Sequence, residues 1–235
     1  MSEIKALFFD VFGTVVDWRS SISRELAEFA SKRGLKGDWD AFADRWRGLY
    51  QPSMEAVRSE GRDWVILDTL HGENLDKAWA EFGLPELSPE DRLHLVKAWH
   101  RLDPWPDAVE GLTRLKSKYI IAPVSNGNIA LITNMAKRAG LPWDVVLGAE
   151  VAKAYKPMPE AYLRSASALA LEPSECMMVA AHNDDLHAAK AQGLKTAFVP
   201  RPLENGPKGP LETDPTGDWD YVSESFVALA ESVGA

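Results

Sequence analysis

The sequence has few of the features that mark a secreted or membrane-bound protein. Its 235 residues include a single cysteine, Cys176, so no disulfide can form within the chain. No run of about 18 apolar residues is present, so no transmembrane helix is expected. The first ten residues, MSEIKALFFD, lack the pattern of a signal peptide. These absences predict a cytoplasmic protein without a membrane partner.

Basic residues are also scarce. The chain has 26 Lys and Arg against 35 Asp and Glu, which gives a formal net charge of −9. Because nucleic acids are polyanions, no nucleic-acid partner is expected. A small anionic substrate remains compatible with this charge, since nearby cationic side chains and helix N-termini outweigh a distant net charge. The 46% hydrophobic content is enough for one large core or a core with a smaller lobe.

What is present is an alternation of apolar strands and amphipathic helices. Strands are expected at residues 4–9, 119–124, 144–147, 176–181 and 196–199, and helices at 20–33, 109–115, 129–139, 159–170 and 186–192. This alternation predicts an α/β fold, in which a Rossmann-like parallel sheet forms the core and carries helices on both faces.

One long segment interrupts the alternation. Residues 38–101 have a helical pattern throughout, with Ser88 as a helix N-cap and Pro89 at the first helical position. We therefore predict an α/β core domain of residues 1–16 plus 104–235, and an inserted all-helical cap domain of residues 17–103. The cap would cover the carboxyl edge of the sheet, where open α/β sheets bind their ligands.

Three of the predicted strands end in polar residues at that edge. Asp10 follows the first strand, Ser125 and Asn126 follow the second, and residues 182–185 follow the fourth. A carboxylate directly after a buried strand needs compensation from backbone N–H groups, a cation or a donor such as Thr14. Taken alone, Asp10 is equally well explained by an Asx-type turn. The convergence of three polar loops favours a catalytic site.

The segment FFDVFGT, residues 8–14, resembles the first motif of the haloacid dehalogenase superfamily. Phosphatases of that superfamily usually read D-x-D-x-T, and their second Asp is the acid–base; here Phe12 takes its place. An aromatic ring cannot protonate a leaving alkoxide, whereas a leaving halide needs no proton. The motif is thus similar to that of the (S)-2-haloacid dehalogenase type II branch. The resemblance implies that Asp10 is the nucleophile, that Thr14 supports it, and that Phe12 lies beside the substrate and halide.

Two further motifs continue the resemblance. It implies that Ser125 holds the substrate carboxylate and that Asn126 lies near the halide; an ordinary helix N-cap is the alternative. Lys156, in YKPMPEAY, would keep Asp10 ionised, with a solvated surface lysine as the alternative. Tyr162 would lie near the active site, unless it is a packing tyrosine.

The fourth motif departs from the branch. Better-known dehalogenases have a Ser-Ser-Asn-x-x-Asp loop, whereas residues 180–185 read AAHNDD. Asp185 aligns with the final Asp and would orient Lys156 and help to activate water. His182 falls at the Asn position, as a supporting donor, as a base for the hydrolytic water, or as a capping histidine. Asn183 beside it is predicted to contact the substrate or halide.

The cap is expected to supply an arginine for the halide or the substrate carboxylate. Trp46-Arg47 resembles a W-R pair of the branch, so we choose Arg47; Arg45 is the rival, and a surface arginine is the alternative.

The resemblance implies hydrolysis of small 2-halo acids to 2-hydroxy acids through an ester on Asp10, with no metal and no cofactor. A homodimer is compatible, since family members are often dimers. A Mg²⁺-dependent phosphatase, with Asp10, Asp184 and Asp185 as ligands, is one alternative function. A non-catalytic binding protein on this fold is the other.

Overall fold

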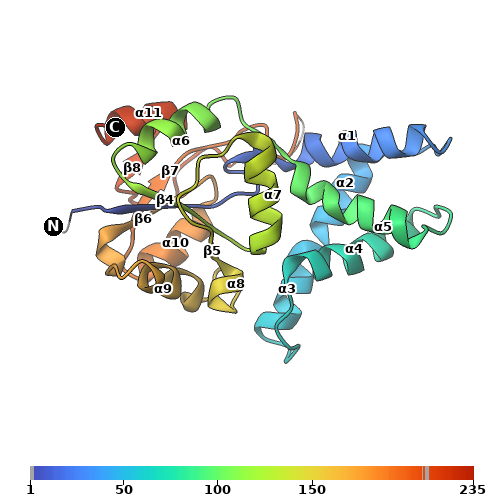
Figure 1. Ribbon diagram of the computed structural model, residues 1–235, viewed down its shortest axis with the longest axis horizontal. Helices are drawn as coiled ribbons and strands as arrows, with labels where there is room; N and C mark the ends of the chain where they lie inside the picture. The colour runs from blue at the N-terminus through green and yellow to red at the C-terminus, as the bar shows by residue number, and fades with distance from the viewer. Residues whose placement is uncertain (1–2, 208, 210–211) are drawn as a thin grey trace.

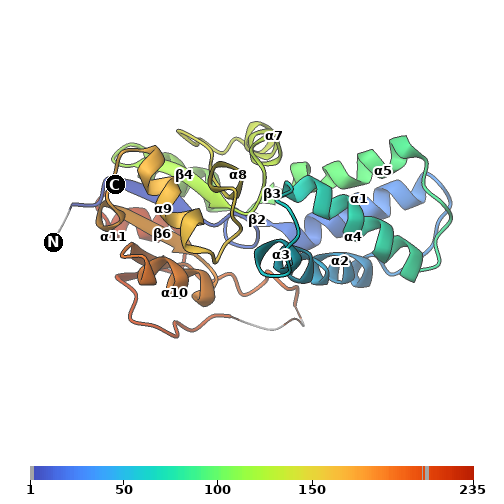
Figure 2. The same ribbon diagram turned by 90° about the horizontal axis from the view of Figure 1, so that it is seen from below.

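The structure of the protein is a computed structural model that describes residues 3–207, 209 and 212–235. Residues 1–2, 208, 210 and 211, which the sequence assigns to the core domain, lie outside the described residues. The chain forms a sheet-based core and a helical cap beside it (Figures 1 and 2). Among the described residues, no helix has both the length and the apolar character needed to span a bilayer.

A six-stranded sheet, with every pairing parallel, forms the centre of the core. Its strand order is β5-β4-β1-β6-β7-β8. The strands are β1 (Ala6–Phe9), β4 (Ile120–Ser125), β5 (Leu147–Gly148), β6 (Cys176–Ala180), β7 (Lys195–Phe198) and β8 (Tyr221–Val222). Because β1 lies between β4 and β6, the loops that follow these three strands are neighbours at one edge.

Helices cover both faces of this sheet, which confirms the predicted fold class. Leu7 and Phe9 of β1 belong to the hydrophobic cluster that includes α6 and α11, whereas Ala6 and Phe8 belong to the cluster that includes α9 and α10. Alternate residues of a strand point to opposite faces, so β1 contributes to both clusters. The core helices are α6 (Ala108–Lys116), α7 (Ile129–Ala139), α8 (Ala149–Ala152), α9 (Pro159–Ala168), α10 (Asn183–Ala191) and α11 (Phe226–Ser232), with the 3₁₀ turn η2 (Pro173–Glu175).

Some elements differ from the sequence prediction. The strand expected at 144–147 begins only at Leu147. At Asp144 the side-chain carboxylate, in place of a backbone carbonyl, accepts the hydrogen bond from the Ile121 N–H at 2.9 Å. Helix α10 begins at Asn183, three residues before the predicted start. Its first turn contains Asp184 and Asp185, and polar residues of this kind indicate a loop when they are read from the sequence. Acidic side chains are nevertheless favourable at a helix N-terminus. The elements α8, β8 and α11 were not predicted.

The inserted segment consists of helices joined by loops, and no strand lies among the described residues from 18 to 102. Its helices are α1 (Trp18–Ser31), α2 (Trp39–Gly48), α3 (Tyr50–Arg58), α4 (Leu67–Glu81), α5 (Pro89–Val96) and the 3₁₀ helix η1 (Lys97–Arg101). Ser88 is the N-cap of α5, as predicted: its Oγ accepts a hydrogen bond from the Asp91 N–H at 3.1 Å, and Pro89 follows at the first helical position.

A short antiparallel ladder connects the two parts. The strands β2 (Val16–Asp17) and β3 (Asp103–Pro104) pair where the chain leaves the core and where it returns. We propose this ladder as the junction between the two domains, because it contains both boundaries expected from the sequence. One continuous hydrophobic cluster joins cap residues such as Trp46 and Trp99 to Phe12 of the core. The cap is therefore packed firmly over the edge of the sheet that follows β1.

Candidate active site

Asp10 lies at the centre of a buried hydrogen-bond cluster immediately after β1. Its Oδ1 accepts from Lys156 Nζ at 2.9 Å, and its Oδ2 accepts from Thr14 Oγ1 at 2.7 Å. The Ala181 N–H donates to Thr14 Oγ1 at 2.9 Å, which directs the threonine hydrogen towards Asp10. Burial alone raises the pKa of Asp10, but Lys156, His182 and Thr14 hold this pKa well below its usual range. Asp10 is therefore an ionised carboxylate at neutral pH.

Lys156 places its ammonium between two carboxylates. Besides Asp10, its Nζ forms an ion pair with Asp185 Oδ2, and the Tyr162 hydroxyl donates to Asp185 Oδ1 at 2.5 Å. Burial alone lowers the pKa of Lys156, but the two carboxylates outweigh it and raise this pKa above its usual value. Burial also raises the pKa of the Tyr162 hydroxyl, so the side chain remains a neutral donor. Tyr162, Asp185 and Lys156 thus contact one another in that order, and Lys156 contacts Asp10.

The loop after β4 comes close to the same cluster. Asn126 accepts a hydrogen bond on Oδ1 from the backbone N–H of Lys156 at 2.7 Å, which connects the two loops. Ser125 is fully buried, and its Oγ accepts from the Gly127 N–H at 3.0 Å. Gly148 has a φ of +98°, and a Cβ there would lie 2.4 Å from the Ser125 carbonyl oxygen. Only glycine allows the backbones to approach this closely.

His182 reaches Asp10 from the loop after β6. Its Nδ1 lies 3.2 Å from Asp10 Oδ2, and its Nε2 lies 2.8 Å from Glu204 Oε2. Glu204 is a buried carboxylate that also accepts from Trp18 Nε1 at 3.1 Å. Burial alone lowers the pKa of His182, but the two carboxylates raise it well above its usual value. A protonated histidine cannot act as a base, so the resting geometry favours the supporting-donor alternative.

Asn183 does not join this cluster. Its Nδ2 donates to Glu212 Oε1 at 2.9 Å and to the Asp214 carbonyl at 3.0 Å. Its Oδ1 accepts from the Thr216 N–H and from Trp219 Nε1, each at 3.0 Å. The prediction of a substrate contact for Asn183 therefore needs correction: as the first residue of α10, it turns its amide towards residues 212–219 and anchors that segment to the core.

Arg47 points from the cap into a group of aromatic rings. Its Cζ lies 4.1 Å from the centroid of the Tyr50 ring, 5.4 Å from that of Trp18 and 5.8 Å from that of Phe12. Its Nη1 is buried without a hydrogen-bond partner among the described residues. An arginine nitrogen held in this way is suited to an anionic ligand, because a buried donor is costly when it is left unpaired.

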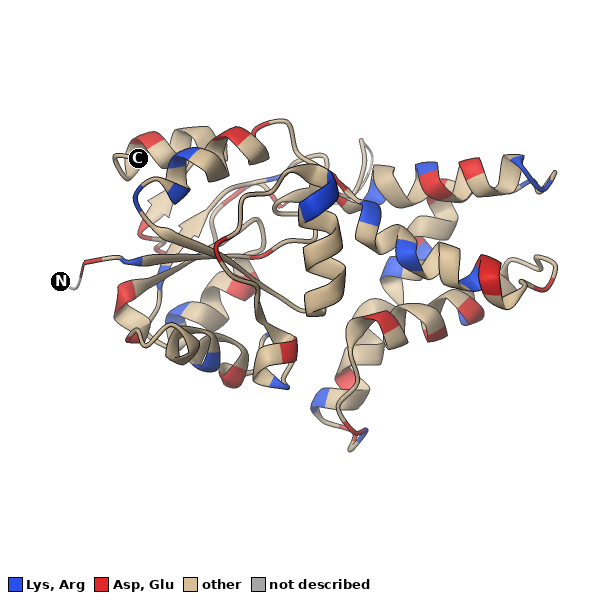
Figure 3. Cartoon of the chain, in the orientation of Figure 1, with Lys and Arg blue, Asp and Glu red and all other residues tan. Residues whose placement is uncertain are grey.

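The rival arginine lies on the outside of the cap. Arg45 forms an ion pair with Glu81, with 2.6 Å between Nε and Oε2, and about two fifths of its side chain is exposed. Lys and Arg are interspersed with Asp and Glu over the helices of both parts of the molecule (Figure 3). Arg45 thus belongs to the paired surface charges, and Arg47 is the arginine that the structure directs inwards.

Two cap residues that sequence reasoning missed lie beside Phe12. The Phe12 ring packs edge-on against His71 and Trp99, with ring centroids 6.3 and 5.9 Å away. Both ring nitrogens of His71 and the Nε1 of Trp99 are buried without a hydrogen-bond partner among the described residues. Burial lowers the pKa of His71 to about 3, so its imidazole is neutral. No motif marks these residues in the sequence, because their place follows only from how α4 and η1 pack.

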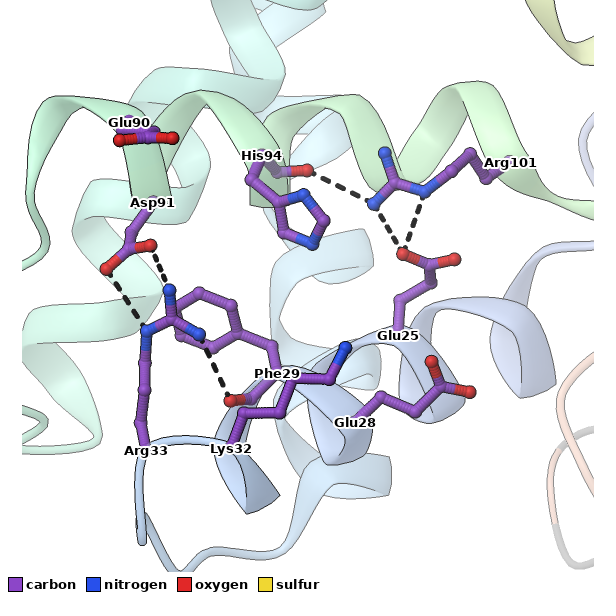
Figure 4. A pocket seen from close by; sticks show the side chains of 9 residues that line it. All are labelled: Glu25, Glu28, Phe29, Lys32, Arg33, Glu90, Asp91, His94 and Arg101. Atoms are coloured by element: carbon purple, nitrogen blue, oxygen red, sulfur yellow. Dashed lines mark hydrogen bonds and ion pairs between the residues drawn. The ribbon is translucent and has the colours of Figure 1, made fainter.

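A separate cavity of about 450 Å³ lies between α1 and α5 (Figure 4). Both arginines that line it pair with carboxylates of the same cavity: Arg33 Nε donates to Asp91 Oδ2 at 3.1 Å, and Arg101 Nε donates to Glu25 Oε2 at 2.9 Å. None of the residues that line this cavity belongs to the Asp10 cluster. The cavity is therefore a paired surface groove of the cap and not the catalytic site.

The carboxylates around Asp10 do not fit a bound Mg²⁺. The ammonium of Lys156 already lies between the Asp10 and Asp185 carboxylates, and the Asp184 side chain is exposed. Among the described residues, no group of three or more His, Cys, Asp or Glu side chains has the arrangement needed to hold a metal ion. The donor set that the phosphatase alternative requires is therefore not assembled here.

The core is a parallel α/β sheet with an aspartate, paired with a lysine, directly after its first strand. An inserted helical cap covers this edge of the sheet. Together these features define a capped hydrolase with an aspartate at its centre. Residues 4–193 match the family model of haloacid dehalogenase-like hydrolases, and the chain belongs to that family. This match confirms the resemblance seen in the sequence.

Three relatives are particularly informative. The (S)-2-haloacid dehalogenase 4A of Burkholderia cepacia is 31% identical over 207 residues, which cover 86% of this chain and 85% of that protein. A solved structure of a defluorinating L-2-haloacid dehalogenase is 50% identical, with a TM-score of 0.97, and covers 99% of this chain and 96% of its own. A second L-2-haloacid dehalogenase structure is 42% identical, with a TM-score of 0.95, and covers 98% of this chain and 99% of its own.

Proposed function

We propose that the protein hydrolyses small 2-halo carboxylic acids to 2-hydroxy acids through an ester on Asp10. The observation that carries this proposal is the ionised Asp10 carboxylate paired with Lys156, with Phe12 in place of a second carboxylate. A halide leaves without a proton. The displacement therefore needs the Asp10 carboxylate as nucleophile, but it does not need the second carboxylate that Phe12 replaces. The similarity to proteins named as 2-haloacid dehalogenases supports the same function.

In the first step, an oxygen of Asp10 attacks C2 of the substrate. The new C–O bond forms as the carbon–halogen bond breaks, and the halide leaves with the bonding electron pair towards Arg47 and Asn126. Ser125 and nearby backbone N–H groups hold the substrate carboxylate. Attack from the side opposite the halogen inverts C2, so an (S)-2-halo acid gives an (R)-2-hydroxy acid. Holding the two reacting atoms in line under a closed cap supplies much of the acceleration.

In the second step, water attacks the carbonyl carbon of the ester. The bond between that carbon and the alcohol oxygen breaks, the 2-hydroxy acid takes one proton of the water, and the second proton is released to solvent. Asp10 is regenerated as a carboxylate that contains one oxygen from water. The Lys156 ammonium balances the charge of the Asp10 carboxylate, and Asp185 holds that ammonium in place.

A halide-release assay in excess EDTA tests this function. Chloroacetate, fluoroacetate and (S)-2-chloropropionate form the panel, and fluoroacetate is included because one relative is described as defluorinating. We expect halide release at the same rate with and without EDTA, since the Lys156 ammonium provides the cation that a metal would otherwise supply. A Mg²⁺-dependent phosphatase would instead release phosphate from p-nitrophenyl phosphate only with Mg²⁺. A binding protein would show no turnover at all.

Replacing Arg47 with alanine is expected to lower kcat/KM by about 10²- to 10³-fold, as for the loss of one donor to developing negative charge. The reason is that the departing halide would lose the cation that lies beside the Phe12 ring. The measurement is steady-state halide release by both variants.

Arg45→Ala is the matched control, because it removes an arginine of the same helix that pairs with Glu81 at the surface. We expect this control to keep nearly full activity, since exposed ion pairs contribute little. An equal loss in the two variants would argue against a place for Arg47 in the site.

The cytoplasmic location and the homodimer stay predictions. They are part of this proposal but bear on none of its catalytic steps.

A further inference from the structure

The two ring nitrogens of His182 face two different carboxylates. Nδ1 lies 3.2 Å from Asp10 Oδ2, and Nε2 lies 2.8 Å from Glu204 Oε2. An ionised carboxylate only accepts hydrogen bonds, whereas a neutral imidazole has only one N–H. Both contacts are therefore satisfied together only when His182 is a doubly protonated cation. Neither of the two reaction steps described above involves the protonated His182 side chain.

Glu204 is held in place on several sides. The residue is 8% exposed, and its Oε1 accepts a hydrogen bond from Trp18 Nε1 at 3.1 Å. The carboxylate packs against Gly13, where a Cβ would lie 2.0 Å from Oε1. The Glu204 N–H donates to the Arg201 carbonyl at 3.0 Å, and Arg201 Nε donates to the Thr14 carbonyl at 2.9 Å. Glu204 is thus fixed against the same loop that carries Asp10.

The hydrogen bonds of Asp10 distinguish its two oxygens. Oδ2 accepts from both Thr14 Oγ1 and His182 Nδ1, whereas Oδ1 accepts from Lys156 Nζ. Each carboxylate oxygen has about two lone pairs for such bonds. Oδ1 therefore keeps a lone pair for attack on the substrate, and Oδ2 remains as the carbonyl oxygen of the ester that results.

The charge on Oδ2 changes in opposite directions in the two steps. During attack on the halo acid, the carboxylate loses its negative charge, so a cation beside Oδ2 does not favour this step. During ester hydrolysis, water adds to the carbonyl carbon, and the electron pair of the C=O bond moves onto Oδ2 as an oxyanion. Donors that are already aimed at this oxygen stabilise that transition state selectively.

We propose that His182 stabilises the oxyanion that forms on Asp10 Oδ2 during ester hydrolysis, and that Glu204 is the positioning residue that keeps His182 protonated and aimed at this oxygen. The inference rests on the proposed function, since it requires the ester on Asp10. When the tetrahedral intermediate collapses, the electron pair on Oδ2 restores the C=O bond and the alcohol oxygen leaves, while His182 retains its proton.

The charged groups around His182 set the expected pH dependence. Asp10 after β1 and Glu204 after β7 face the ring, and Lys156 lies beyond Asp10 on its other oxygen. Burial lowers the pKa of His182, and in the free protein the two carboxylates raise it. In the ester only the Glu204 charge remains beside the ring, so hydrolysis should fail on the alkaline side, where the ring loses its proton. Removing the Glu204 charge lowers this pKa, and the alkaline limb of kcat should then move to lower pH.

The decisive experiment compares Glu204→Gln with the wild type in rapid-quench reactions with (S)-2-chloropropionate, followed by mass spectrometry of the intact protein. We expect ester hydrolysis to slow about tenfold, because a charged donor to Oδ2 is replaced by a weaker one, with little change in the halide burst. The protein-bound ester should accumulate in this variant only. Glu25→Gln is the matched control, since it removes a partly buried glutamate that pairs with Arg101 in the cap.

A second variant separates a positioning role from a merely structural one. The amide nitrogen of His182→Asn takes the place of Nδ1 and keeps a donor for Oδ2, but it has no counterpart of Nε2. In this background, Glu204→Gln should slow hydrolysis no further, and the alkaline limb should disappear because no titrating ring remains. Equal slowing of the halide burst and of hydrolysis, or an unchanged alkaline limb in Glu204→Gln, would overturn the inference.

The imidazole resonances of the free protein provide a readout that does not depend on turnover. His182→Asn identifies the His182 signal, whose titration should move to lower pH in Glu204→Gln. An unmoved titration would overturn the pairing with Glu204 even in an active enzyme. If the wild type released no halide, the proposed function and the oxyanion role of His182 would both be wrong. A His182 titration that still moved in Glu204→Gln would then show that the pairing of His182 with Glu204 is correct on its own.

Discussion

Asp10→Asn is expected to abolish dehalogenation while leaving the fold intact. An amide oxygen is a far weaker nucleophile than a carboxylate, so kcat should fall by at least about 10⁴-fold, in the range seen for the loss of other enzyme nucleophiles. The substituted side chain keeps the size of the original, and its amide oxygen can still accept a hydrogen bond from Lys156 or Thr14. The measurement is halide release, with the mass of the protein checked to exclude deamidation back to aspartate.

Labelled water gives an independent check on the same residue. A single turnover in H₂¹⁸O should place the heavy oxygen in Asp10 and not in the product, because water attacks the ester carbonyl carbon. Peptide mass spectrometry of the segment around Asp10 measures the incorporation. Label that appeared only in the 2-hydroxy acid would mean that water attacks C2 directly, and Asp10 would then not be the nucleophile.

The catalytic centre could be predicted largely because its residues follow strands. Asp10, Ser125 and His182 each come directly after an apolar run, and neighbouring parallel strands place their loops at one edge. Lys156 follows no strand, and only its resemblance to a family motif indicated it. The structure brings these side chains and Asp185 together, but their individual roles stay predictions until the variants are measured.

The residues that sequence reasoning missed depend on packing over long separations. Glu204 lies in a stretch without apolar periodicity. The His182 and Trp18 side chains that contact its carboxylate are 22 and 186 positions away in the chain. The resemblance of Trp46-Arg47 to a W-R pair favoured Arg47 over Arg45, but it did not show where either side chain points. Two residues apart on a helix, they point to different sides, and only the packing of α2 shows which side faces the core.

Asn183 was misassigned for a related reason. A polar residue beside a catalytic loop is easily assigned to the substrate, but the first residue of a helix can turn its side chain away from the sheet edge. Here the amide is engaged by residues of the segment 212–219, for which the sequence offered no structural prediction. The position of a residue along the chain determined its neighbourhood but not the direction of its side chain.

Lys156→Met is expected to impair both activity and stability, because it removes the cation between two buried carboxylates. We expect kcat to fall by about 10³-fold and the free energy of unfolding to fall by about 3–5 kcal/mol at neutral pH, as when one partner of a buried ion pair is lost. Lys97→Met is the matched control. It also breaks a lysine–aspartate pair, with Asp68, but this lysine is more than one third exposed, so the loss should stay below about 1 kcal/mol.

The pH dependence of the Lys156→Met variant tests the electrostatic reason directly. In the wild type, the pKa of Asp10 is lowered in the folded state, so its ionisation stabilises the protein above the unfolded pKa, and this contribution is lost as the pH falls. Without Lys156, Asp10 and Asp185 repel each other and the pKa of the pair rises, so the variant should regain relative stability as the pH falls through that raised value. Urea midpoints between about pH 3 and 8 would show the wild type losing this contribution below the unfolded pKa of aspartate, while the variant gains relative stability over the same fall in pH. Adding Asp185→Asn should restore much of the stability but none of the activity, since it removes the repulsion without returning the cation to Asp10. Recovery of activity in this double variant would show that Lys156 acts only as structural support.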